Sequence, residues 1–125
     1  MNMLIRVFAA LFAVILLLNG LGWAFSPSNA ASFLGMSLMD GLGRSSQIAD
    51  VGAFFWGAGI TIMLGLKTRN IVWYQASALL LGFAAVLRVL AWAVHGAPIA
   101  LQQITIEVLI VSVLMTAASR LTKQT

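Results

Sequence analysis

VFAALFAVILLLNGLGWAF, residues 7–25, contains no charged side chain, and a stretch of this kind decides the fold. The hydrocarbon core of a bilayer is about 30 Å thick, and an α-helix needs about 20 apolar residues to cross it. Residues 46–66, 71–94 and 98–119 meet the same requirement. Because a lone strand in lipid leaves its backbone polar groups unsatisfied, these spans are expected to be helices. The sequence therefore predicts one all-α domain over residues 1–125, an integral membrane four-helix bundle with an outer loop at residues 27–45.

The composition agrees with a membrane protein. Hydrophobic residues make up 62% of the chain and charged residues 8%, whereas a soluble domain carries about 25% charged residues. The net charge is +4, but the basic residues stand singly at the ends of apolar runs and form no patch. We therefore expect membrane lipid as a partner and no nucleic acid.

Several kinds of chemistry have no residues to support them. The chain has no cysteine and one histidine, so neither a thiolate nor a histidine-rich metal site is expected, and no cofactor is predicted. The sequence contains no G-x-S-x-G, H-E-x-x-H, P-loop or dinucleotide-binding pattern. These observations favour a non-enzymatic protein.

Lysine and arginine predict the orientation, because cytoplasmic loops carry an excess of both. Only Arg44 falls in a loop on one side of the predicted membrane. The basic residues on the other side are Arg6, Lys67, Arg69, Arg120 and Lys123. Both termini are therefore expected in the cytoplasm, with residues 27–45 and the His95 turn outside.

Two segments leave alternatives open. Arg6, the aliphatic run and Ser28-Asn29-Ala30 also match a cleavable signal peptide, whose removal would leave the other three helices in the same orientation. The apolar side chains between Ala30 and Met39 fit either a short helix lying on the membrane surface or a loop packed over the mouth of the bundle.

A polar cluster is predicted inside the spans. Asn19, Asp50, Arg88 and Glu107 lie on four different helices, and a rise of about 1.5 Å per residue places all of them in the outer half of the membrane. An unpaired charge there is costly, so Arg88 is expected to pair with Glu107, with Asp50, or with both.

Polar neighbours on the same helical faces extend this cluster outward. Residues three, four or seven apart share a face, so the cluster is expected to open into a funnel whose mouth is formed by Gln47, Trp92, His95 and Gln103. Three interpretations remain open: an ion pair that only fixes helix register, a binding site for a small ligand, and a pathway for protons or ions.

Small residues repeat every four positions on two helices, a pattern that lets helices approach closely. They are Ala49, Ala53 and Gly57 on the second helix and Ala78 and Gly82 on the third. We expect them to pack within the bundle, with a dimer interface as the alternative.

The order of short motifs resembles small bacterial membrane proteins of domain of unknown function 4345, which are similar in style to DoxX-like four-helix proteins. The motifs that carry the resemblance are Asn19-Gly20-Leu21-Gly22, Pro27, Ser45-Ser46-Gln47-Ile48-Ala49-Asp50, Leu87-Arg88, Gly96-Ala97-Pro98 and Glu107. The resemblance spans nearly the whole chain and implies a four-helix protein of the bacterial inner membrane, without implying an activity.

Two functions follow as expectations. The first is an accessory or structural subunit of a larger membrane complex, or a bundle that associates with itself. The alternative is a binder or transporter of a small amphipathic ligand, such as a lipid or a quinone, that uses the polar cluster.

Overall fold

The computed structural model describes residues 1–122, and every regular element in that range is helical. In chain order these are α1 (Asn2–Phe25), α2 (Pro27–Phe33), α3 (Gly41–Ser46), the π-helix η1 (Gln47–Val51), α4 (Gly52–Thr68), α5 (Ile71–His95) and α6 (Leu101–Arg120). α3, η1 and α4 run on without a break as one long helix, the α3–α4 helix. Within the described range, α1, the α3–α4 helix, α5 and α6 are long and apolar enough to cross a membrane.

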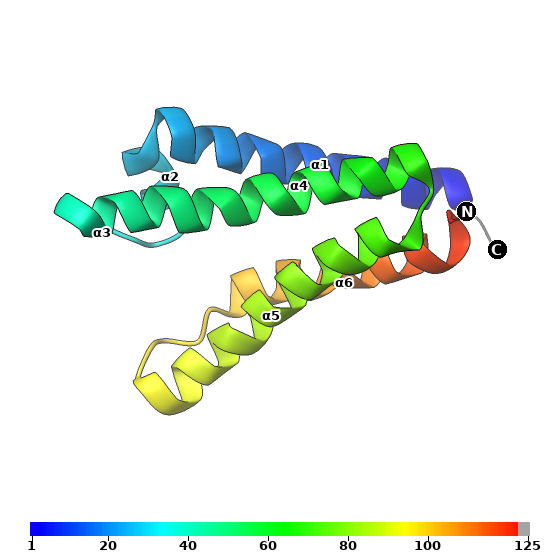
Figure 1. Ribbon diagram of the computed structural model, residues 1–125. Helices are drawn as coiled ribbons and strands as arrows, with labels where there is room; N and C mark the ends of the chain where they lie inside the picture. Colours follow the sequence, from blue (N-terminus) through cyan, green and yellow to red (C-terminus); the bar gives the residue numbers. More distant parts are fainter. Residues whose placement is uncertain (123–125) are drawn as a thin grey trace.

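The four long helices form two pairs (Figure 1). α1 packs along α4, and α5 packs along α6. The pairs meet at the end that carries Met1, the turn at residues 69–70 and the end of α6, and they diverge toward the opposite end. We call the first the terminal end and the second, with residues 26–40 and 96–100, the loop end.

Local sequence explains where the helices begin and end. Asn70 caps α5, because its side-chain oxygen accepts a hydrogen bond from the backbone N–H of Val72 at 3.0 Å. α5 ends at Gly96, which has φ of 73°, a conformation that glycine adopts without strain. The backbone N–H of Ala97 then turns back to Ala91 O at 3.1 Å. The chain therefore leaves the helical path, and α6 begins at Leu101 rather than at the predicted Pro98.

The core lies where all four helices meet. Its members are mostly alanines and branched aliphatic side chains: Ile5, Ala9, Ala13, Leu16, Ala58, Ile62, Tyr74, Ala78, Leu81, Ile110, Leu114, Ala117, Ala118 and Leu121. The hydroxyls of Thr61 and Ser77 hydrogen-bond to each other and link α4 to α5, and Ser77 Oγ also lies 3.3 Å from Ala58 O. The two hydroxyls therefore satisfy one another inside an apolar core.

Close contact between α1 and α4 depends on glycine. A Cβ on Gly59 would lie 2.7 Å from Leu17 Cγ and 3.1 Å from the backbone oxygen of Ala13. A Cβ on Gly20 would lie 2.9 Å from Trp56 Cδ1, and the indole N–H of Trp56 donates to Gly20 O at 3.1 Å. The missing side chains let the two helices touch along their length.

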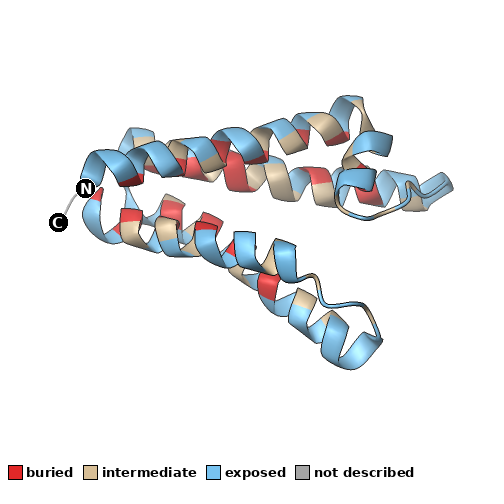
Figure 2. Ribbon diagram, turned by 180° about the vertical axis from the view of Figure 1, so that it is seen from behind, coloured by how far each residue is buried: buried red, intermediate tan, exposed pale blue. Residues whose placement is uncertain are grey.

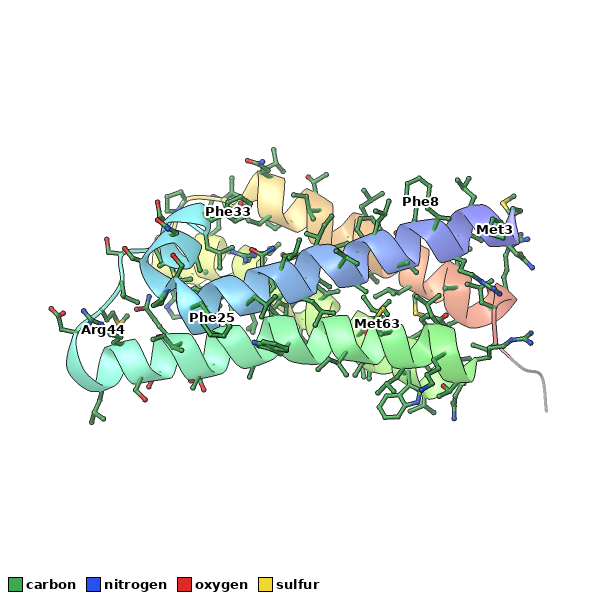
Figure 3. All side chains as sticks on the ribbon, turned by 90° about the horizontal axis from the view of Figure 1, so that it is seen from above. Met3, Phe8, Phe25, Phe33, Arg44 and Met63 are labelled. Atoms are coloured by element: carbon green, nitrogen blue, oxygen red, sulfur yellow. The ribbon has the colours of Figure 1, made fainter. Side chains whose placement is uncertain are left out.

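The outward faces of the bundle are apolar. Figure 2 shows buried positions confined to the inner faces of the long helices, and Figure 3 shows Phe8 on α1 and Met63 on α4 among the side chains that cover the outside. Exposed large apolar side chains occur on each long helix, for example Leu18, Ile60, Phe83 and Leu109.

Basic residues gather at the terminal end. Arg6 lies near the start of α1, Lys67 and Arg69 flank the end of α4, and Arg120 ends α6. Arg44, at the loop end, lies far from Met3 (Figure 3). Lys123, which is predicted to belong to the basic group, lies outside the described residues.

Candidate functional site

The predicted ion pair is present between α5 and α6. Arg88 Nε donates to Glu107 Oε1 at 2.9 Å, and the side chains of Arg88 and Glu107 are 33% and 9% exposed. The nearly complete burial of the carboxylate means that the guanidinium must compensate for its lost solvation. This contact confirms the prediction that Arg88 pairs with Glu107.

The ion pair uses only part of the hydrogen-bonding capacity of Arg88. A guanidinium has five N–H donors in a planar fork and no acceptor. Within the described chain, its one hydrogen bond runs through Nε to Glu107. The Nη groups of Arg88 form no hydrogen bond with the described residues.

One cavity of about 180 Å³ lies beside this pair, and we call it the Glu107 cavity. Four polar residues line it: Asn19, Arg88, Gln103 and Glu107. Its apolar walls come from Ile15, Leu16, Phe33, Leu34, Phe54, Phe55, Leu81, Ile106 and Ile110. The cavity thus draws residues from α1, α2, α4, α5 and α6, and it places polar groups of α1, α5 and α6 together as the sequence predicts.

A second cavity of about 330 Å³, the Asp50 cavity, is also lined by Arg88. It is lined by Leu34, Met36, Asp50, Val51, Phe54, Phe55, Ala84 and Arg88. The two cavities therefore share Arg88, Leu34, Phe54 and Phe55. A single guanidinium forms part of the wall of both.

The prediction that Asp50 is a second partner of Arg88 is wrong. Among the described residues, its carboxylate forms no ion pair and no hydrogen bond, and it is exposed. The physical reason is the divergence of α5 from the α3–α4 helix toward the loop end, which separates the two side chains. Asp50 also lies in the π-helix η1, a helical irregularity that is often found at functional sites.

Three of the four residues predicted at the funnel mouth lie elsewhere. Trp92 and His95 are exposed on α5 and line neither cavity, because this part of α5 lies beyond Arg88 on the diverging arm. Gln47 is buried and holds the outer loop: its side chain accepts from Met39 N at 2.7 Å and donates to Ser37 O at 3.1 Å. Gln103 alone lines the Glu107 cavity.

The outer loop packs over the mouth of the bundle. It contains the short helix α2, whose Ala31 is fully buried, and continues without regular structure to Asp40. Leu34 and Met36 extend from it into the walls of the cavities. The segment thus contains a seven-residue helix and also contributes to the cavity walls, and a position on the membrane surface stays a prediction.

The small residues divide into two groups. Ala78 is buried between helices as expected. Ala49 and Ala53 are exposed. A Cβ on Gly57 or Gly82 would meet nothing within 4 Å. The prediction that Ala49, Ala53 and Gly57 pack inside the bundle is therefore wrong. The residues that do pack there are Gly52, Gly59 and Gly65, and the seven-residue spacing of Gly52 and Gly59 was a signal for the inward face.

Among residues 1–122, no group of three potential His, Cys, Asp or Glu ligands could hold a metal ion. What the described cavities offer is hydrogen bonding and charge within apolar walls. Comparison with protein-family models, curated proteins and solved structures found no match. Membership of domain of unknown function 4345 therefore stays a prediction.

Proposed function

We propose that this chain is a multi-pass membrane protein that binds a small amphipathic molecule, such as a lipid or a quinone, in the cavities at its loop end. The observation that carries the proposal is the Glu107 cavity, in which Asn19, Gln103, Arg88 and Glu107 converge within apolar walls. Ligand sites typically combine such walls with a few convergent polar groups. A carboxylate as buried as that of Glu107 also costs stability, which a function would explain.

The proposed location is the inner membrane of a bacterium, with both termini in the cytoplasm. The apolar outward faces support a lipid surround, since soluble monomers rarely expose such large apolar areas. The basic residues of the terminal end support its cytoplasmic placement. The loop end, with the cavities, then faces the external side.

The orientation is tested by single cysteines, because the natural chain has none. Thr68 and Ile99 are exposed at opposite ends of α5, and neither has the positive φ that makes Gly96 unsuitable for substitution. Thr68→Cys is expected to react only with a permeant thiol reagent in intact cells, whereas Ile99→Cys should also react with an impermeant one. Labelling of both from the same side would contradict the proposal.

Binding is tested by native mass spectrometry of protein extracted in mild detergent. The wild type is expected to retain small amphipathic molecules, and Arg88→Leu combined with Glu107→Leu should fold but retain far fewer. A matched control is Thr61→Val combined with Ser77→Ala, which removes an interhelical polar contact away from the cavities. Equal retention by all three proteins would refute the proposed site.

A second proposal is association with another copy of the chain or with other membrane subunits, as a structural or accessory component. The outward position of Ala49, Ala53 and Gly57 supports it, because small residues let a neighbouring helix approach closely. Gly57→Leu should then weaken a cross-linked oligomer in membranes. A strictly monomeric wild type would contradict this second proposal.

A further inference from the structure

Asp50 and Arg88 line the same cavity without pairing. Both contribute to the wall of the Asp50 cavity, yet their charged groups lie beyond the 4.0 Å limit for an ion pair. Arg88 and Asp50 therefore present opposite charges to one cavity without neutralising each other. A ligand that carries charges of both signs could contact both groups from within this cavity.

The unused hydrogen-bonding groups describe what that occupant needs. Arg88 presents Nη donors, which bind phosphate or carboxylate oxygens in pairs. Asp50 presents a carboxylate that accepts hydrogen bonds from a cation. Phe54, Phe55 and Met36 form apolar walls beside them, as an alkyl chain requires.

The charge balance argues against a purely anionic ligand. Glu107 already neutralises Arg88, and the carboxylate of Asp50 has no ion-pair partner among residues 1–122, so one net negative charge remains. A purely cationic ligand would leave the Nη donors of Arg88 without an acceptor. A headgroup with both charges satisfies both sides of the cavity.

On the basis of the proposed function, we propose that the Asp50 cavity binds the headgroup of a zwitterionic phospholipid that has a primary ammonium, as phosphatidylethanolamine does. The phosphate accepts hydrogen bonds from the Nη groups of Arg88. The ammonium donates to the carboxylate of Asp50. The acyl chains leave along the apolar side chains of α4 and α5.

The test uses the full chain in nanodiscs that contain equal amounts of phosphatidylethanolamine and phosphatidylglycerol with identical acyl chains. Lipid retained after transfer to detergent is counted by native mass spectrometry. The wild type should retain phosphatidylethanolamine on the order of tenfold better, the size of one charge-assisted hydrogen bond. Asp50→Asn should bring the ratio close to one, and Arg88→Gln should reduce retention of both lipids.

Asp40→Asn is the matched control, because Asp40 is an equally short acid on the same side of the molecule whose side chain is 98% exposed and lines neither cavity. It should keep the preference of the wild type. Thermal melting by circular dichroism confirms that each variant is folded.

Equal retention of the two lipids by the wild type, or an unchanged preference in folded Asp50→Asn, would overturn this inference while leaving the proposed function in place. A wild type that retains no lipid would overturn both.

Discussion

The two ends of the bundle are built on opposite principles. At the terminal end, α1, α4, α5 and α6 meet through alanines and glycines, and the buried hydroxyls of Thr61 and Ser77 satisfy each other. At the loop end the two helix pairs separate, and Phe54 and Phe55 line the cavities there. Arg88 holds hydrogen-bond donors that the described residues do not use.

This difference separates stability from function within one small protein. The terminal end joins the helices by close packing, which needs no partner molecule. The loop end keeps an ion pair beside two cavities, and a buried carboxylate of this kind costs stability. Substitutions at the two ends should therefore fail in different ways, and the following predictions run from the largest expected effect to the smallest.

The largest effect is expected at the ion pair of the loop end. Arg88→Leu leaves Glu107 buried without its cation and should destabilise the fold by about 3 to 5 kcal/mol. Adding Glu107→Leu should recover much of that loss, because replacing both partners of a buried pair is often nearly neutral. Thermal melting of the two single variants and the double variant gives the coupling free energy. Strict additivity would show that the pair does not act as a unit.

A smaller effect is expected from overpacking the α1–α4 contact. Gly59→Ala places a Cβ against Leu17 and the backbone of Ala13, so it should destabilise the fold by about 1 to 3 kcal/mol. The control is Gly57→Ala, which enters open space on the same helix and should leave the melting temperature unchanged or slightly raised. If both variants melt alike, close packing does not account for this contact.

The next effect is local to the outer loop. Gln47→Leu removes the hydrogen bonds to Met39 N and Ser37 O and should lower local stability by about 1 to 2 kcal/mol. Hydrogen exchange of residues 34–40 should accelerate while exchange in the terminal-end core stays as in the wild type. Gln102→Leu, at an exposed position of α6, is the control. Faster exchange throughout the bundle would mean that the two ends do not behave separately.

The smallest effect is expected at the other ion pair. Arg44 and Asp40 are 50% and 98% exposed and lie four residues apart, and such pairs contribute little. Asp40→Ala should leave the melting temperature within experimental error. A clear loss of stability would show that the loop depends on this contact more than on Gln47.

The sequence predicted what depends on composition and chain order. Four apolar spans follow from length alone, and pairing of Arg88 with Glu107 follows from the scarcity of cations among the apolar spans.

The positions of side chains at the loop end depend on the angle between the two helix pairs, and the sequence of a single span does not determine that angle. Separation of Asp50 from Arg88 and the position of Trp92 both follow from the divergence of α5 at the loop end. The α3–α4 helix carries small residues on two faces, one through Gly52 and Gly59 and one through Ala49 and Ala53. Spacing alone cannot tell which face turns inward.

The anchoring of the outer loop has a mechanical consequence. Gln47 and Arg44 hold Ser37, Met39 and Asp40, and both anchors belong to the same continuous helix. The loop is therefore tied to the α1–α4 pair, and α5 and α6 form the other pair. A hinge rotation of the two pairs about the terminal end would widen both cavities. It would break none of these hydrogen bonds, because the outer loop would move together with the α1–α4 pair.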